Sequence, residues 1–351
     1  MNYYLGGDVS KGYADFVILD SSKSVVEENF QLDDTFDGHR KLYEVLMELL
    51  KKDSSAHIYS AVESTGGYEN NWYNFLCKYK RELPLSVVRL NPVGVHYNLK
   101  AGLNRNVTDK ISARGIAEYL LSHSNKIRYD SQDNFTELRK QKKFVDMLTK
   151  QKVQIENQLE KILYSANPEI LVYCKKKKPA WLFQLLLKYP TAEKLSRAKA
   201  INLQKIAYLK DVKIENIIEK AKKSIASDSG VIIDNLIISM VNQILHFESE
   251  IQKQVKAMIA NCKLDEVNLL TSFIGIGDKS AIELILEIGF IERFPSVKKL
   301  ASFFGLHPVF KQSGDGKSGM HMSKQGRRSP RATLYMVAFS GINHNPVIRQ
   351  V

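Results

Sequence analysis

Short apolar runs mark the first third of the chain. Runs rich in β-branched and aromatic residues at 2–10, 13–20 and 24–32 follow one another closely, a spacing typical of hairpin strands. Continuous apolar runs at 56–63 and 84–92 predict two further strands. The pattern therefore predicts a sheet that begins with three antiparallel strands.

Helical segments interleave with the later strands. Residues 35–52 carry apolar side chains at three- and four-residue steps, which predicts an amphipathic helix. A second helix is expected over 65–79, after a glycine turn, and a third over 109–123, with Asp109 at its start. The predicted order is three strands, then helix, strand, helix, strand and helix, which describes an α/β domain.

The pattern becomes purely helical from about residue 135. A stretch over 135–168 carries apolar residues at alternating three- and four-residue steps, as in a coiled coil, and a second such stretch spans 233–260. These stripes can pack within one chain or between subunits. The run "CKKKKPAW" at 174–181 is either a solvated loop or a phosphate-facing patch. The first seam consists of Leu138, Val145, Leu148, Ile155, Leu159 and Ile162, with Gln141 and Lys152 as polar interruptions.

The third region, 267–351, combines a glycine turn with a basic loop. The "GIG" at 275–277 precedes an apolar helical segment, and it fits either an ordinary helix start or a helix-hairpin-helix turn whose amides approach a phosphate. The segment 311–331 is rich in glycine, serine, lysine and arginine. A serine in such a loop can approach a phosphate closely, and nearby cations would stabilise a developing alkoxide. A solvated basic loop is the competing interpretation.

Composition and charge narrow the class of protein. With 44% hydrophobic and 25% charged residues, the chain of 351 residues has the composition of a soluble globular protein. Its net charge of +13 favours a polyanionic partner, nucleic acid first. The three cysteines are far apart, which excludes a disulfide framework and a CxxC zinc site. No signal pattern and no apolar run near the length of a membrane span is evident, so we expect a cytoplasmic protein without membrane contact.

Three acidic residues stand at the ends of predicted elements. Asp8 ends the first strand, Glu63 ends the fourth, and Asp109 begins the last helix of the α/β domain. Sites in open α/β sheets lie outside the carboxyl ends of strands, and carboxylates suit Mg²⁺. Asp8 alone could belong to an ordinary Gly-Asp turn. Together the three acids, in this order of elements, match the layout of RNase H-like nucleases.

The chain resembles the insertion-sequence transposases of the one-ten family, which carry a DEDD nuclease domain and a catalytic serine domain. Five segments carry the resemblance, in the family's order and over nearly the whole chain: "GGDVSK", "AVESTGGYENNW", "NRNVTDKISARGIAEYL", "FIGIGDKSAIELILEIG" and "LASFFGLHPVFKQSG".

The resemblance implies a DNA recombinase with an RNase H-like (RuvC-like) fold at its N-terminus. It further implies strand exchange between target and donor DNA under the guidance of a structured bridge RNA. It also implies a covalent phosphoserine intermediate, and Mg²⁺ bound at a composite site that the serine domain of another subunit completes. By motif position, Asp8, Glu63 and Asp109 are the first three acids, and Ser313 is the nucleophile.

The fourth family acid is replaced here. It should lie three residues after Asp109, where this chain has Ser112. A hydroxyl is neutral and is a poorer Mg²⁺ ligand than a carboxylate, so the replacement predicts weaker metal binding, a water-mediated ligand or impaired activity.

We therefore predict three regions: an RNase H/RuvC-like domain over 1–130, a helical coiled-coil region over 131–266 and a mainly α serine transposase domain over 267–351. We expect a dimer that forms tetramers on nucleic acid. The competing functions are a DNA invertase of the pilin-inversion type, a catalytically weakened nucleic-acid-binding relative and a Holliday-junction resolvase. The residues expected to contact phosphates are Lys311, Lys317, Lys324, Arg327, Arg328 and Arg331.

Overall fold

Two compact units make up the computed structural model of the chain, Met1–Gln132 and Asp133–Val351. Each is described by itself. The three-region division expected from the sequence stays a prediction. The described residues are 2–101, 108–127, 129, 135–174, 178–209, 211–310 and 320–350.

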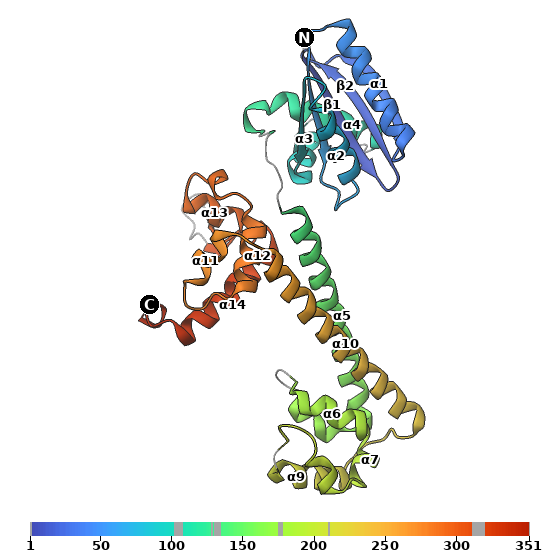
Figure 1. Ribbon diagram of the computed structural model, residues 1–351, viewed down its shortest axis with the longest axis vertical. Coiled ribbons are helices and arrows are strands. Elements are labelled where there is room, and N and C mark those ends of the chain that lie inside the picture. The colour runs from blue at the N-terminus through green and yellow to red at the C-terminus, as the bar shows by residue number, and fades with distance from the viewer. Residues whose placement is uncertain are drawn as a thin grey trace, which may run out of the picture. The chain divides into compact units, whose positions relative to one another are not determined.

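The first unit contains a five-stranded sheet with the order β3-β2-β1-β4-β5 (Figure 1). The first three strands pair antiparallel, whereas β4 runs parallel to β1 and β5 runs parallel to β4. This arrangement confirms the expected N-terminal α/β domain. The strands are β1 (Asn2–Ser10), β2 (Tyr13–Asp20), β3 (Val25–Asp33), β4 (His57–Glu63) and β5 (Leu85–Leu90).

Helices cover both faces of the sheet. One face packs against α1 (Phe36–Lys52) and α2 (Asn70–Tyr79), whose apolar stripes join the strands in a core around Trp72. The other face packs against α3 (Pro92–Ala101) and α4 (Asp109–Ser122) through Ala61, Ile116 and their neighbours. Because successive side chains of a strand point to opposite faces and both faces are covered, the sheet separates two distinct cores.

Two local features depart from the sequence prediction. The helix α3 was not expected, because Pro92 was interpreted as the end of a strand, although proline also suits the first turn of a helix. The helix α2 begins at Asn70, three residues after Gly67 of the glycine turn from which it was expected to start. The carboxylate of Glu69 accepts hydrogen bonds from the backbone N–H groups of Thr65 and Gly67, at 3.2 and 2.8 Å, and holds the preceding segment as a loop.

Two long helices of the second unit, α5 (Thr136–Ala166) and α10 (Val231–Asn261), pack along each other within the chain (Figure 1). The polar interruptions of the α5 seam are both satisfied by α10. Gln141 donates to the carbonyl oxygen of Gln254 at 3.2 Å, and Lys152 forms an ion pair with Glu248. The α5 stripe thus contributes to intramolecular packing, while the coiled-coil dimer stays a prediction.

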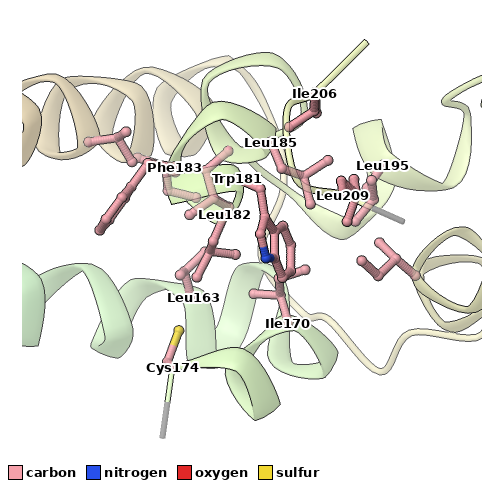
Figure 2. Close-up of a cluster of buried hydrophobic side chains, with 14 of the residues drawn as sticks. Leu163, Ile170, Cys174, Trp181, Leu182, Phe183, Leu185, Leu195, Ile206 and Leu209 are labelled. Atoms are coloured by element: carbon pink, nitrogen blue, oxygen red, sulfur yellow. The ribbon is translucent and has the colours of Figure 1, made fainter. Parts of the chain in front are cut away.

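Short helices complete a hydrophobic core around one end of this helix pair. Figure 2 shows Trp181, Leu182 and Leu185 gathered with Leu163 of α5. Of the lysine run, residues 175–177 lie outside the described residues, and Lys178 forms an ion pair with Glu160 at 2.6 Å. That lysine therefore faces acids of its own chain. The helices are α6 (Ala180–Lys188), α7 (Ala192–Ser196), α8 (Ala200–Leu203) and α9 (Asp211–Lys222).

The C-terminal elements share a third core with the ends of the long helices. Phe135 and Met258 pack there with Ala281 and Ile282. The "GIG" segment joins two helices, as expected, but its role in phosphate binding stays a prediction. The elements are α11 (Asp265–Thr271), α12 (Asp278–Ile288), α13 (Val297–Phe303), β6 (Pro308–Phe310), β7 (Met320–Met322) and α14 (Arg328–His344).

The helix α10 corrects one sequence-based expectation. By length and by a mean hydropathy of 1.2 over 18 residues, it meets the criterion for a membrane-spanning helix, although no such run was expected. Part of its apolar surface serves packing, because Ile237, Val241 and Ile244 belong to the core of buried residues around Trp181. Asp234 is also buried on this helix, where Lys194 and Thr191 bind its carboxylate at 3.0 and 3.1 Å.

Candidate functional site

Asp8 and Glu63 lie at the same edge and on the same face of the sheet. The parallel register pairs Gly7 with Val62, so the two acids follow directly at the carboxyl ends of β1 and β4. Asp8 belongs to β1 itself, because the strand continues to Ser10 before the turn. The turn interpretation of Asp8 is therefore wrong.

The third acid is brought to this edge by α4. Thr108 caps the helix by accepting a hydrogen bond from the backbone N–H of Ile111, which places Asp109 in the first turn. Gly6 allows the helix to lie directly on β1. A Cβ atom at Gly6 would lie 2.5 Å from the backbone nitrogen of Ala117 and would also collide with the carbonyl oxygen of Ala113. A missing side chain therefore sets how closely Asp109 approaches the strand acids.

The electrostatics of Asp8 show that these residues share one environment. Its pKa is raised from 3.8 to about 6, first by burial, then by the charges of Asp109, Glu63 and Asp15. The hydroxyl of Ser112 opposes the shift by hydrogen bonding to the Asp8 carboxylate. The structure thus brings together all four residues that the sequence assigned to a metal site. Their role as ligands stays a prediction.

Burial also raises the pKa of Glu63. Asp109 has a contact outside the group, since the Tyr13 hydroxyl donates a hydrogen bond to it at 3.3 Å.

A further acid, Asp15, was missed by the sequence analysis. The register places it directly opposite Asp8 on β2, and it is only 4% exposed. Its carboxylate accepts hydrogen bonds from the amides of Asn29 and Gln31 at 2.9 and 3.2 Å. The signal was present, because an acid inside the apolar run "YADFVILD" needs a partner when it is buried.

The donor set suits a hard cation in chemistry more than in spacing. All candidate ligands are carboxylate or hydroxyl oxygens, which Mg²⁺ prefers. The pKa of Asp8 is raised first by burial and then by the neighbouring acids. Within the described ranges, no group of three His, Cys, Asp or Glu side chains is arranged to hold a metal ion. The residues therefore match Mg²⁺ in the chemistry of their oxygen donors only, and water and substrate oxygens would have to supply the other ligands.

The proposed nucleophile and two of the basic residues, Ser313, Lys311 and Lys317, lie outside the described residues. The strands β6 and β7 flank this segment, and they pair antiparallel from Pro308 with Met322 to Phe310 with Met320. This small hairpin was not predicted from the sequence.

Gly305, before β6, and Gly326, after β7, both have positive φ, and the backbones of the two segments lie close together there. A Cβ on Gly305 would lie 2.6 Å from the carbonyl oxygen of Gln325, and one on Gly326 would lie 2.6 Å from that of Phe303.

The remaining basic residues divide into two kinds. Arg331 donates to the backbone carbonyl oxygens of Phe304 and Gly326 at 2.9 and 3.1 Å, and Arg327 forms an ion pair with Glu287 at 3.0 Å. Lys324 and Arg328 are exposed, with no side-chain hydrogen bond or ion pair to the described part of the chain. Those two are therefore the better candidates for phosphate contacts.

Two serines that could compete with Ser313 as the nucleophile, Ser323 and Ser329, lie among the described residues of the second unit. Ser329 accepts a hydrogen bond from the buried ammonium group of Lys142 at 3.0 Å, while the same ammonium pairs with Asp146 at 2.8 Å. Lys142 thereby links α5 to the first turn of α14 and holds the Ser329 hydroxyl in place. Ser318, the other close competitor, lies outside the described residues.

Two solved structures show only weak likeness to this chain. The Holliday-junction complex of RuvC from T. thermophilus is 11% identical, covers 36% of this chain and 96% of its own, and has a TM-score of 0.28. A Ppx/GppA phosphatase from Aquifex aeolicus is 13% identical, covers 71% of this chain and 93% of its own, and has a TM-score of 0.21. Neither likeness carries weight beside the strand order.

Sequence comparison is more informative. A relative from Streptomyces coelicolor, described as the "Insertion element IS110 uncharacterized 43.6 kDa protein", is 32% identical over 99 residues. The match covers 28% of this chain and 24% of that protein. A family model described as "Transposase", for DEDD transposases of the IS110 type, matches residues 5–168, and a model of the "Transposase IS116/IS110/IS902 family" matches residues 267–351. The chain therefore belongs to the IS110 family of transposases.

Proposed function

We propose that this protein is a DNA transposase that cleaves and exchanges DNA strands. The observation that carries the proposal is the convergence of Asp8, Glu63 and Asp109 at one edge of the sheet, where Asp8 has a pKa of about 6. The strand order, with acids at the carboxyl ends of β1 and β4, supports an RNase H-like fold for this unit. The net charge of +13 suits a protein that holds DNA.

Asp8, Glu63 and Asp109 would hold Mg²⁺, with Ser112 as a further oxygen at its side. Bound there, the ion would polarise the phosphate and stabilise charge on the attacking and leaving oxygens. The chain's own residues position the site. Gly6 admits α4, and the cap at Thr108 fixes the helix start.

The covalent step is assigned to Ser313. Its hydroxyl oxygen would attack the phosphorus of a DNA phosphodiester, so that one P–O bond to deoxyribose breaks and a phosphoserine ester forms. The serine proton leaves to solvent or base, and the departing deoxyribose oxygen takes up a proton. Attack by the hydroxyl of the incoming strand reverses these steps and releases the serine. The basic residues around the β6/β7 hairpin support the assignment, because they offset phosphate charge.

A guide RNA and a symmetric oligomer complete the proposal. The same cationic surface that binds DNA would bind RNA, and a site shared between subunits explains why the nucleophile and the acids lie in different units of one chain. The apolar residues Phe144, Met147 and Val153 are exposed on α5 and could contact a second subunit. RNA that co-purifies with the protein would separate this function from that of a guide-independent invertase.

The decisive experiment traps the covalent adduct. Full-length protein is incubated with nicked target DNA, Mg²⁺ and co-purified RNA, and the denatured adduct is mapped by mass spectrometry. We expect the DNA on Ser313, and no adduct from Ser313→Ala or Asp8→Asn. Ser323→Ala, in the same basic segment, is the matched control and should still form the adduct. An adduct on Ser318, or one that persists in Ser313→Ala, contradicts the assignment.

A catalytically weakened relative is the second candidate, and Ser112 favours it. The side chain at the position of the fourth family acid hydrogen bonds to Asp8 and adds no negative charge. If the site is short of one carboxylate, Ser112→Asp should bind Mg²⁺ about tenfold more tightly, because ligand charge tunes affinity for hard cations. Calorimetric titration of the wild type and the variant measures this difference. Equal affinities would show that no fourth acid is needed.

A further inference from the structure

A recess lies at the edge of the sheet that carries Asp8 and Glu63, but on the face covered by α1 and α2. It has a volume of about 410 Å³, within the usual range of ligand sites. The start of α1, the two residues before it and one side of α2 form the recess. Asp8, Glu63 and Asp109 do not line it. Its lining consists of Asp34, Thr35, Phe36, His39, Asn71, Asn74, Phe75 and Lys78.

The recess is tied to the same edge as Asp8 by the backbone. β1 ends at Ser10, and the carbonyl oxygen of Gly12 in the following turn accepts a hydrogen bond from the backbone N–H of Asp34 at 2.8 Å. Asn71 is the second residue of α2, which follows the loop after Glu63. The recess therefore lies beside the edge of the sheet at which β1 and β4 end.

The polar floor of the recess is fixed in place. The carboxylate of Asp34 contacts His39 Nε2 at 2.6 Å and accepts a hydrogen bond from the Asn71 amide at 2.8 Å. His39 is only 6% exposed, and its ring stacks on Trp72 with the centroids 3.8 Å apart. Asp34 is thus held as an oriented acceptor before any ligand arrives, and its oxygens keep further lone pairs.

The open side of the recess offers flat apolar surface and a cation. Phe36 is 76% exposed, so the face of its ring is accessible to a ligand in the recess. Asn74 is exposed with no side-chain hydrogen bond to the described residues, and Lys78 follows one turn later on the same face of α2. Stacking surface, amide groups, a fixed carboxylate and a cation at the rim are the features that bind an unstacked nucleotide.

We propose that this recess binds one unstacked nucleobase of a single strand whose backbone runs along the acid-bearing edge. The base would stack on Phe36, present its edge to Asp34 and Asn74, and leave its phosphate near Lys78. Because Asp34 only accepts hydrogen bonds, bases with an exocyclic amino group (adenine, cytosine and guanine) are favoured over thymine and uracil. The proposal rests on the proposed function only for the identity of the strand as DNA or RNA.

The test uses the full-length protein in chelator, so that binding is measured without strand cleavage. The probes are 12-nucleotide single strands of DNA and of RNA with 2-aminopurine at the centre, a base whose fluorescence falls when it stacks. We expect quenching on binding to the wild type, in the DNA, the RNA or both, which identifies the strand. For Phe36→Ala we expect recovery of the fluorescence and at least about fivefold weaker binding.

Two controls make the result specific. Phe36→Trp restores a ring and should bind at least as well as the wild type. Tyr164→Ala removes a ring that is also 76% exposed, but on α5, and should bind like the wild type. Unchanged binding and quenching by Phe36→Ala, an equal loss in Tyr164→Ala, or no quenching with either strand would overturn the proposal.

Asp8→Asn distinguishes failure of the recess from failure of the proposed function. It should abolish strand exchange without weakening the 2-aminopurine signal. Normal Asp8-dependent strand exchange with no Phe36-dependent signal overturns the recess alone. A Phe36-dependent signal together with strand exchange that survives Asp8→Asn overturns the proposed acid site alone.

Discussion

The acidic edge of the sheet and the basic hairpin of the second unit are organised in opposite ways. At the acidic edge, like charges are brought together and partly buried, so that Asp8 holds its proton up to a pH of about 6. Around the β6/β7 hairpin, two cationic side chains have partners within the protein, since Arg327 pairs with Glu287 and Arg331 binds backbone carbonyl groups. Charged side chains that lack an oppositely charged partner in the fold therefore indicate a functional site better than the number of charged residues in a sequence segment does.

The acidic edge should be the more sensitive of the two regions. We expect Asp8→Asn to reduce strand exchange by about 1,000-fold, because it removes a central carboxylate from a preorganised electrostatic site. Glu28→Gln, which changes an exposed acid on β3 in the same isosteric way, is the control and should be neutral. Strand exchange by Asp8→Asn at the rate of Glu28→Gln would remove the acid site from the mechanism.

The hairpin region should respond mainly through stability. Gly305→Ala combines strain from positive φ with a collision against the backbone of Gln325, and we expect it to lower the free energy of unfolding by about 3 kcal/mol. Gly12→Ala is the matched control, because Gly12 also has positive φ but has open space around its Cβ position, and it should lose about 1 kcal/mol. Urea unfolding measures both, and equal losses would mean that the two backbones can separate freely.

The acidic edge should make the free energy of unfolding depend on pH through the titration of Asp8. Its folded-state pKa of about 6 lies above the ordinary 3.8, so the folded protein binds a proton at a higher pH than the unfolded chain does. The ionised carboxylate therefore destabilises the fold at neutral pH, and metal-free protein should become more stable as the pH falls from 7 towards 4. Asp8 is partly exposed, so we expect only about 1 kcal/mol between pH 7 and pH 5.

Urea unfolding in chelator, on the wild type and Asp8→Asn, tests this linkage. Asparagine does not titrate, so the difference between the two pH dependences belongs to Asp8 and its neighbours. Identical pH dependences would show that the crowding of acids has no energetic effect.

The smallest effects are expected from the free cations near the hairpin. Lys324→Gln and Arg328→Gln should each weaken binding of unrelated DNA sequences a few-fold and reduce the slope of log affinity against log salt by about 1. Arg331→Gln should instead lower thermal stability, because it leaves the carbonyl groups of Phe304 and Gly326 without their donor. A loss confined to one DNA sequence would indicate base contacts in place of phosphate contacts.

The sequence predicted regular elements well and their junctions poorly. Strand alternation and helical period located all five strands of the sheet and the long helices, because burial on one face imposes the pattern directly. It missed α3, whose first residue is a proline, and it did not foresee that the Glu69 carboxylate binds the backbone of the loop before α2.

The candidate site was predicted in the same uneven way. Asp8, Glu63 and Asp109 were found because acids at element ends stand out in the sequence. Asp15 was missed because its importance depends on its register opposite Asp8, which only strand pairing reveals. The loss of Arg327 and Arg331 to internal contacts likewise depends on tertiary packing.

Because α4 packs directly on Gly6, the glycine at this position of β1 determines how close Asp109 lies to Asp8. An added methyl group there would have to push the helix outward, and Asp109 would travel with it while Asp8 stayed on the sheet. Displacements of about 1 Å are enough to slow positioned chemistry by about 100-fold. A single mutation at position 6 can therefore change the distance between the carboxylates of Asp8 and Asp109 without replacing either residue.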